Sequence, residues 1–234
     1  MLIACKLRPT SFGIALIKKW ASGIPLVVDI DDWELGFLYH SGFWGKVGRF
    51  LNFSNPNGLP YTWLMERLTG FADSIIVSNR FLQNKFSGPL VYHCRDTSIL
   101  DPDKFDSVNI KTKLALKGKR VVMFLGTPRA HKGMEELFMA IEKIKDTRIR
   151  LVLIGADPSV QSHIDRMKSN QDRVVIFPKI PFKELPEHLS AADILVIPQR
   201  DTTDTQGQIP AKLFDAMAMA KPVITTPLSD IEEV

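Results

Sequence analysis

Two glycines and two cations lie in one short stretch between an apolar run and a helical pattern. They are Gly126, Arg129, Lys132 and Gly133. Gly126 allows a sharp turn, and Gly133 lets backbone amides approach a ligand at a helix N-terminus, where the helix dipole favours an anion. Together with the two cations, this arrangement suits a diphosphate. The alternative is a solvated basic turn, and the spacing matches neither a P-loop nor a G-x-G-x-x-G dinucleotide turn.

A second stretch with unusual residues begins at Gln206. Pro210 is well placed as a first helical residue, and Gly207 and Gln208 present amides just ahead of it. Asp215 interrupts an apolar row more than one turn into the same helix. If it is buried it needs partners, which sugar hydroxyls would provide. It could equally face solvent or pair with Lys212.

Two further places carry polar or rigid residues after apolar runs. The stretch around Lys179 and Ile180 contains two prolines and by itself predicts only a rigid turn. Asp29 and Asp31 spell D-x-D, a motif that binds a metal ion in some enzymes. Alternation along a strand would put both aspartates on one face of the strand rather than on a loop, so we expect no metal site there.

Short β-branched runs alternate with helical patterns along the chain. The expected strands are residues 24–30, 74–78, 90–92, 120–125, 150–154, 173–177, 193–197 and 221–225. Continuous apolar runs are typical of parallel strands buried between helices. Helical spacing follows Gly133, Phe182 and Pro210, and an early helix is expected from Phe12 to Trp20. This alternation predicts an α/β fold with parallel sheets.

The polar stretch from Asp101 to Lys119 lacks apolar periodicity and is interpreted as a linker. We therefore place a domain boundary near residue 112, with a partial N-terminal domain over 1–112 and a C-terminal domain over 113–234. The first domain has only three convincing strands and begins close to a helix, and the second ends without a closing helix. Both ends are expected to be truncated.

Taken in order, these residues resemble the C-terminal domain of family 4 glycosyltransferases, which have the GT-B fold of two Rossmann-like domains with parallel sheets. The residues that carry the resemblance are Gly126…Lys132-Gly133, Leu153-Ile154-Gly155, Phe177…Leu185, Ala192-Asp193-Ile194…Pro198, Pro210…Lys212-Leu213-Phe214-Asp215-Ala216-Met217 and Lys221-Pro222-Val223-Ile224. The first half resembles the family more weakly, through Asp29-Ile30-Asp31-Asp32-Trp33-Glu34, Arg95-Asp96 and Asp101-Pro102.

The resemblance implies a retaining hexosyltransferase that uses a nucleotide diphosphate sugar as donor and needs no cofactor or metal. The donor would bind the C-terminal domain, and a sugar or lipid-linked acceptor the N-terminal one. Lys132 would hold the diphosphate and stabilise the departing charge, and Asp215 would match the second acid of the E-x7-E motif, which binds ribose hydroxyls. The other donor-binding residues implied are Gly126, Thr127 and Gly133 in the first loop, Lys179 and Ile180 at the base, and the amides of Gly207, Gln208 and Ile209 at the sugar and phosphates.

Three positions depart from the family's pattern. Thr127 stands where the family usually has an arginine, and we expect Arg129 to substitute for it. The first acid of E-x7-E falls at Gly207, so Gln206 or Gln208 would have to supply that contact. Asp31 stands where many members have a histidine, and its carboxylate could stabilise positive charge on the sugar or accept the acceptor's proton.

Composition narrows the remaining possibilities. The formal net charge of +4 is shared evenly by the two halves, which argues against a nucleic-acid partner. Cys5 and Cys94 have no metal-ligand spacing and are expected to be reduced thiols of a cytoplasmic protein. No apolar run is long enough to span a bilayer. Residues 42–51 mix aromatics with cations and could touch the inner membrane face or a lipid-linked acceptor, but three glycines favour a core or pocket-lining loop.

The leading hypothesis is therefore a retaining glycosyltransferase. Two alternatives stay open: a catalytically incompetent fragment that only binds a nucleotide sugar, and a nucleotide-sugar epimerase of the same fold.

Overall fold

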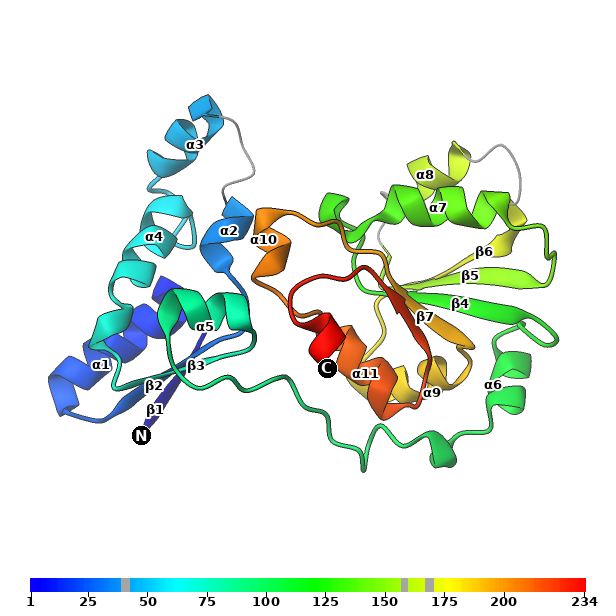
Figure 1. Ribbon diagram of the computed structural model, residues 1–234, viewed down its shortest axis with the longest axis horizontal. Coiled ribbons are helices and arrows are strands. Elements are labelled where there is room, and N and C mark those ends of the chain that lie inside the picture. The colour runs from blue at the N-terminus through cyan, green and yellow to red at the C-terminus, as the bar shows by residue number, and fades with distance from the viewer. Residues whose placement is uncertain (39–42, 157–159, 167–170) are drawn as a thin grey trace. The chain divides into compact units, whose positions relative to one another are not determined.

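The computed structural model describes residues 1–38, 43–156, 160–166 and 171–234. The chain forms two compact α/β units, each built on a parallel sheet (Figure 1). The first unit comprises Met1–His93, Asp201–Ile209 and Pro227–Val234, and the second comprises Cys94–Arg200 and Pro210–Thr226. These units interleave along the sequence, whereas the predicted domains are consecutive. The domain boundary that the sequence predicts near residue 112 therefore stays a prediction.

The first unit contains a three-stranded parallel sheet in the order β1-β2-β3. Its strands are β1 (Leu2–Cys5), β2 (Leu26–Ile30) and β3 (Ser74–Val77). The expectation that the chain begins close to a helix, with no strand before it, was wrong. In β1 only Ala4 is fully buried, because β1 is a short edge strand, so its sequence has no long apolar run. The expected strand over residues 90–92 is also absent, and Leu90 makes only an isolated bridge to Val77.

Helices cover this sheet and supply the rest of its core. They are α1 (Ile14–Ser22), α2 (Glu34–Leu38), α3 (Phe43–Phe50), α4 (Leu59–Arg67), α5 (Arg80–Phe86) and α10 (Thr203–Gln206), with the π-helical turn η1 (Pro9–Gly13) and the 3-10 turns η2 (Thr69–Phe71) and η8 (Ile231–Glu233). Phe12 and Leu16 from the first helical segment pack with Leu26 and Val28 of β2 and with Leu82 of α5. The expected helix over 12–20 is thus displaced by only two residues.

The prediction of a loop over residues 42–51 was wrong for the described part of that stretch. Residues 43–50 form α3, and Val47, Arg49 and Phe50 on it are exposed rather than in a core. Phe50 packs edge-on against Trp63 of α4, with ring centroids 5.9 Å apart. Tertiary contact of this kind overrides the cost of glycine in a helix, which is about 1 kcal/mol per residue.

The second unit contains a five-stranded parallel sheet in the order β6-β5-β4-β7-β8. Its strands are β4 (Arg120–Leu125), β5 (Ile149–Ile154), β6 (Val174–Phe177), β7 (Ile194–Ile197) and β8 (Val223–Thr225). All five strands expected in this part of the sequence are confirmed. The order places β4 at the centre, where the chain reverses its direction of winding, and ligands of open α/β sheets bind at the carboxyl ends of strands at such a point.

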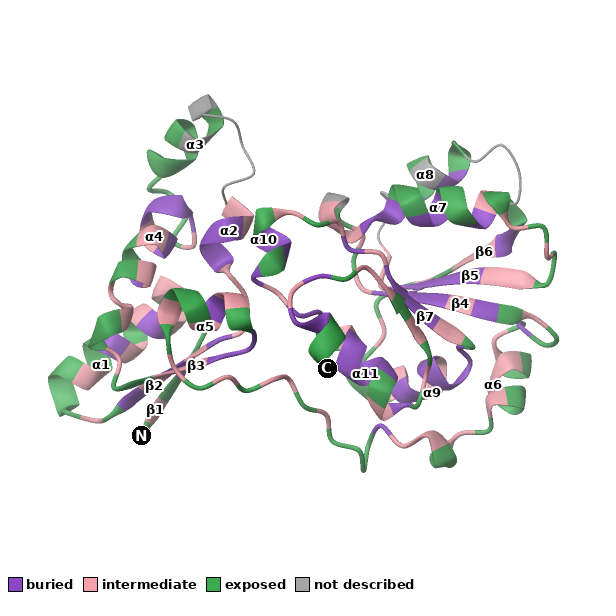
Figure 2. Ribbon diagram, in the orientation of Figure 1, coloured by how far each residue is buried: buried purple, intermediate pink, exposed green. Residues whose placement is uncertain are grey.

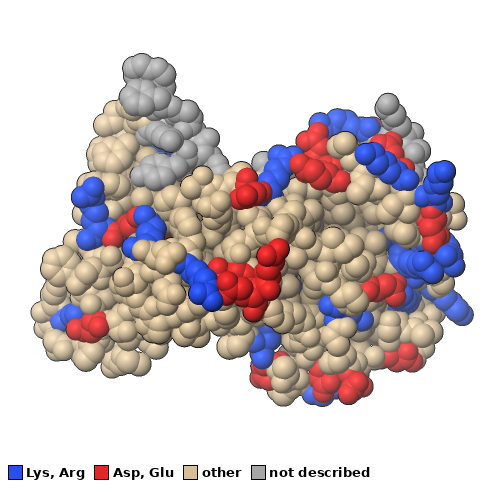
Figure 3. All heavy atoms as spheres, viewed as in Figure 1, with Lys and Arg blue, Asp and Glu red and all other residues tan. Residues whose placement is uncertain are grey.

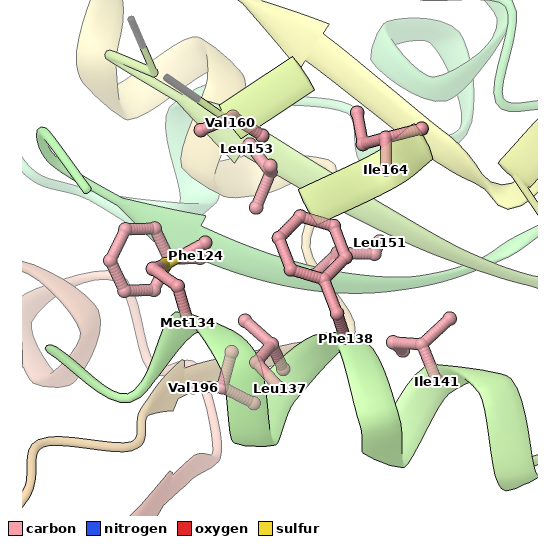
Figure 4. Packing of buried hydrophobic residues seen from close by; sticks show 10 residues of the cluster. All are labelled: Phe124, Met134, Leu137, Phe138, Ile141, Leu151, Leu153, Val160, Ile164 and Val196. Atoms are coloured by element: carbon pink, nitrogen blue, oxygen red, sulfur yellow. The ribbon is translucent and has the colours of Figure 1, made fainter. Parts of the chain in front are cut away.

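Helices lie on both faces of this sheet, α7 and α8 on one and α9 and α11 on the other (Figure 1). Their bounds are α7 (Met134–Lys143), α8 (Gln161–Asp165), α9 (Leu185–Ser190) and α11 (Ala211–Ala218). The unit also has α6 (Ser107–Lys113) and the 3-10 turns η3 (Pro102–Lys104), η4 (Ala130–Lys132), η6 (Gln171–Arg173) and η7 (Phe182–Glu184). Pro210 caps α11 rather than being its first residue. Phe138 and Ile141 of α7 pack on Phe124, Leu151 and Leu153 of the sheet (Figure 4).

Part of the expected linker over residues 101–119 is helical. The Asp106 side chain accepts hydrogen bonds from the amides of Val108 and Asn109 and so caps α6. The strands β4, β5 and β7 are largely buried, while α6 has no buried residue (Figure 2). A helix with no buried side chain shows no apolar periodicity, which explains why the sequence pattern did not indicate it.

Candidate functional site

The loop between β4 and α7 has the backbone conformation that its glycines predict. Gly126 and Gly133 have φ values of +105° and +62°, which side-chain-bearing residues rarely adopt. A Cβ atom on Gly133 would lie 1.7 Å from the carbonyl oxygen of Pro198, so no other residue fits there. Lys132 donates a hydrogen bond from Nζ to the carbonyl of Thr127, at 2.9 Å. The loop therefore folds back on itself and holds the Lys132 ammonium at the end of β4.

Neighbouring strand ends meet this loop. Gly155 follows β5 with a φ of +81°, and a Cβ there would lie 3.5 Å from the Cα of Gly126. The amide of Arg200, after β7, donates to the carbonyl of His131 at 2.8 Å. The β4–α7 loop is thus fixed by contacts at the ends of β5 and β7, along the carboxyl edge of the sheet.

A second lysine lies at the end of β4, and the sequence indicated it only as a partner for Asp215. Lys212 projects from the first turn of α11 and donates from Nζ to the carbonyl of Leu125 at 3.0 Å. Its ammonium lies 4.1 Å from the ring centroid of Phe124. Burial, together with the nearby charge of Lys132, lowers the pKa of Lys212 to about 7. Two lysines at the end of one strand form a strongly cationic place for an anion.

Asp215 is buried and forms an ion pair with Nε of Arg95. The same guanidinium donates from Nη2 to the carbonyl of Ala211, at 3.1 Å. Asp215 therefore neither faces solvent nor pairs with Lys212, the two alternatives to a ligand-binding role. Sequence reasoning missed Arg95 as its partner, because the two residues are far apart along the chain. The guanidinium bond from Nε leaves further acceptor capacity on the carboxylate.

The other predicted residues of this unit are more exposed. Thr127, Arg129 and Lys179 are exposed, and Ile180 is half-buried. Lys179 and Ile180 follow β6, so they lie at the same edge of the sheet as the β4–α7 loop. The amide of Gly155 donates to the carbonyls of Phe177 and Pro178, at 3.1 and 3.3 Å, and so joins the segment after β5 to the end of β6.

In the first unit, charged residues gather at the carboxyl ends of β1 and β2. Nζ of Lys6 lies 3.3 Å from Asp31, 2.7 Å from Asp32 and 3.1 Å from Glu34, and Arg8 pairs with the same glutamate. Burial and the adjacent Asp32 carboxylate raise the pKa of Asp31. Burial alone would lower the pKa of Lys6, but the three carboxylates outweigh it and raise that pKa above its usual value. Sequence reasoning found the two aspartates and missed the lysine that joins them.

Gly207, Gln208 and Ile209 belong to this first unit and not to the unit that contains Lys132. The Gln208 carboxamide donates to Oδ1 of Asp32 at 2.6 Å, and the carbonyl of Gly207 accepts from the amide of Trp33 at 3.1 Å. The Gln208 amide donates to the carbonyl of Thr205, at 3.2 Å, so it already has a partner within the chain. Ile209 is buried.

Two general properties of the described residues bear on the site. Among them, no group of three or more His, Cys, Asp or Glu side chains is placed to hold a metal ion. No helix formed by the described residues has the length and apolar character required to span a bilayer.

The second half of the chain is similar to a known protein family. Residues 119–234 match the family described as glycosyl transferases group 1. The chain is 28% identical, over 109 residues, to the probable glycosyltransferase WbjE of Pseudomonas aeruginosa. The matched segment covers 46% of this chain and 27% of WbjE. The whole chain is therefore much shorter than this relative.

Solved structures resemble nearly the whole chain. HepE of Anabaena, in complex with UDP-glucose, has a TM-score of 0.73 at 16% identity, covering 99% of this chain and 61% of HepE. Sucrose-phosphate synthase of Thermosynechococcus elongatus has a TM-score of 0.65 at 16% identity, covering 99% of this chain and 57% of that protein. At these identities the likeness establishes the fold, which is of the GT-B type as predicted.

Proposed function

We propose that this chain is part of a retaining glycosyltransferase with a nucleotide diphosphate sugar as donor, because residues 119–234 match the family described as glycosyl transferases group 1. The observation that carries the donor site is the pair of lysines at the carboxyl end of β4. Lys132 and Lys212 project from different segments toward that strand end, where α7 also begins. A diphosphate bound there meets two ammonium groups and the N-terminus of a ten-residue helix.

The uridine diphosphate form of the donor is the first to test. The HepE structures resembling this chain are complexes with UDP, UDP with glucose, and UDP-glucose. In our proposal Lys132 stabilises the charge that develops on the departing diphosphate. One such contact contributes about 3–4 kcal/mol to transition-state stabilisation. Gly126, Thr127 and Gly133 shape the diphosphate loop, Arg129 adds charge at its rim, and Lys179 and Ile180 border the base.

Carboxylates complete the proposal. Asp215 accepts hydrogen bonds from the ribose hydroxyls, because its ion pair with Arg95 leaves carboxylate lone pairs available. In the first unit, Asp31 faces the acceptor, and its raised pKa suits a group that accepts a proton. Lys6 positions this carboxylate by ion-pairing. The acceptor is a sugar or a lipid-linked sugar, and transfer proceeds with retention of configuration.

Thermal unfolding with and without UDP-glucose tests the donor site. A ligand present at 100 times its Kd stabilises the folded state by about 2.7 kcal/mol, and we expect a corresponding rise in Tm. Lys132→Ala should remove that rise. Lys143→Ala, at the exposed C-terminal end of α7, is the matched control and should keep it. Absence of a shift with both UDP- and GDP-sugars in the parent chain would refute the donor site.

Product analysis separates transfer from the two alternatives. With acceptor present, a glycosyltransferase releases UDP and a glycoside whose anomeric configuration matches the donor's. An epimerase instead yields an epimer or free sugar without acceptor. A binding-only chain shows the Tm shift but no turnover, even with saturating donor. Either of the last two results would overturn the proposed activity and leave the donor site standing.

A further inference from the structure

A polar and aromatic pocket lies in the first unit, and its lining includes none of the residues of the Lys6 cluster. It has a volume of about 410 Å³ and lies between the last turns of α4 and α5 and the segment that follows β2. This volume is at the lower end of the range for small-molecule sites. The side chains important for its chemistry are Trp33, Trp63, Glu66, Arg67, Lys85 and Phe86.

A single carboxylate organises the polar part of the lining. The indole Nε1 of Trp33 donates to one oxygen of Glu66, at 3.2 Å, and Nζ of Lys85 bonds the other oxygen at 2.7 Å. The Glu66 side chain is only 16% exposed. An acceptor and two donors are therefore held together in one corner of the pocket. The single N–H of the Trp33 indole is used on Glu66, while the Glu66 carboxylate and the Lys85 ammonium retain further bonding capacity.

Cations lie over the aromatic rings that form the rest of the lining. The guanidinium carbon of Arg67 is 4.1 Å from the ring centroid of Trp63, and Nζ of Lys85 is 5.0 Å from that of Trp33 and 5.4 Å from that of Phe86. Cation–π contact holds each cation near a ring while its N–H groups can turn toward a ligand. Basic and acidic side chains lie close together in the region of α4 and α5 (Figure 3).

We propose that this pocket binds a neutral pyranose. Such a ring presents hydroxyls, which both donate and accept, and apolar C–H groups, which pack on aromatic surface. The carboxylate of Glu66 accepts from hydroxyls, and the ammonium and guanidinium groups donate to them. At the corner held by Glu66 a phosphate would meet a like charge, whereas a neutral ring can bond both the carboxylate and the two cations of the lining.

Saccharide binding concerns the first unit alone and does not require a donor at Lys132. Assignment of the bound pyranose to the acceptor side rests on the proposed function. UDP-induced stabilisation, measured on the same samples, therefore distinguishes failure of the pocket from failure of the donor site.

Tryptophan fluorescence provides the test, since two of the chain's four tryptophans line the pocket. We would titrate the whole chain with the methyl glycosides of glucose, galactose and N-acetylglucosamine, and separately with inorganic phosphate. At least one glycoside should give a saturable change. Glu66→Gln should weaken that binding at least about tenfold, as expected for loss of hydrogen bonds to a charged group. Glu232→Gln, an exposed change of equal charge in the same unit, should not.

Two further variants protect the test from artefacts. Trp20→Phe should preserve the titration, because Trp20 lies outside the pocket and packs edge-on against Phe71. If Glu66→Gln lowers Tm strongly, Arg67→Gln replaces it as the test variant, because Arg67 is exposed at the rim of the pocket. The same loss of affinity is expected. The proposal is overturned if no glycoside gives a saturable change, if phosphate alone does, or if both pocket variants bind like the parent.

Discussion

The low pKa of Lys212 predicts that donor binding weakens as the pH rises through neutrality. Burial in the presence of Lys132 brings this pKa from 10.5 to about 7 in the free protein. A bound diphosphate stabilises the charged form of the lysine, so the complex takes up a proton that the free protein has partly lost. Affinity is therefore highest where the free Lys212 is already protonated.

The size of the effect follows from the protonated fraction. With a pKa of about 7, roughly nine tenths of Lys212 is protonated at pH 6 and roughly one tenth at pH 8. The Kd for UDP-glucose should therefore rise about tenfold between these two values, which corresponds to about 1.4 kcal/mol. At pH 7, binding should take up about half a proton. The charge of the sugar diphosphate itself stays constant over this range.

Without ligand, Lys212 makes the folded protein more stable as the pH rises, which is opposite to its effect on donor binding. Lys212 is protonated in both the folded and the unfolded state below pH 7, and the folded state then bears the cost of a buried charge. Between about 7 and 10.5 the unfolded chain binds the extra proton, so this group's contribution to the free energy of unfolding increases with pH.

Isothermal titration calorimetry at pH 6, 7 and 8, in buffers with different ionisation enthalpies, measures both the Kd and the proton uptake. Lys212→Met should bind weakly with no slope over this range, while the Lys143→Met control should behave like the parent. A Kd independent of pH in the parent would refute the reasoning. So would a slope that survives in Lys212→Met, since another group of the loop would then be responsible.

Three further predictions concern contacts that lie within one unit or the other. Gly133→Ala should destabilise the chain by about 2–4 kcal/mol in urea unfolding, because its Cβ would overlap a backbone carbonyl, whereas Gly118→Ala, also at positive φ but with open space around it, should cost about 1 kcal/mol. Arg95→Met should cost about 3–5 kcal/mol because it leaves Asp215 buried without its partner; adding Asp215→Asn should recover part of that loss, and strictly additive costs would contradict the ion pair. Lys6→Met should lower stability at pH 7 by about 1–3 kcal/mol, because three carboxylates then repel one another, and the deficit should shrink toward pH 4 as they are protonated; a deficit independent of pH would count against this account.

The five-stranded sheet could be predicted from the sequence because β4, β5 and β7 are largely buried, and the edge strands β6 and β8, which are only partly buried, keep the same apolar composition. Each such strand is a continuous apolar run, and the pattern needs no knowledge of its neighbours. The edge strand β1 has one buried side chain, and α6 has none, so neither leaves a pattern of this kind. The helix α3 is the reverse case, in which glycines argued against a helix that packs on α4 through Phe50.

The candidate site divides in the same way. The β4–α7 loop is local in sequence, and its glycines and Lys132 could be placed from their order alone. Lys212 and Arg95 depend on which segments fold together, since each meets its partner across a long stretch of chain. Sequence spacing indicated Lys212 as a neighbour of Asp215 at i−3, and the fold instead directs its ammonium to the end of β4.

The position of Gly207 shows how tertiary packing explains a departure from the family's pattern. The resemblance implied an acid at this position, and a contact between that acid and the donor. A Cβ on Gly207 would lie 2.5 Å from the Cβ of Trp33, which is too close for any side chain. Trp33 cannot easily move away, because its amide donates to the Gly207 carbonyl and its indole donates to Glu66. Packing of Trp33 thus excludes the acid, and the neighbouring Gln208 bonds Asp32 instead. Because Gln208 is held by Asp32, Gln206 is the first residue to substitute in testing whether a neighbour replaces that acid in the proposed donor site.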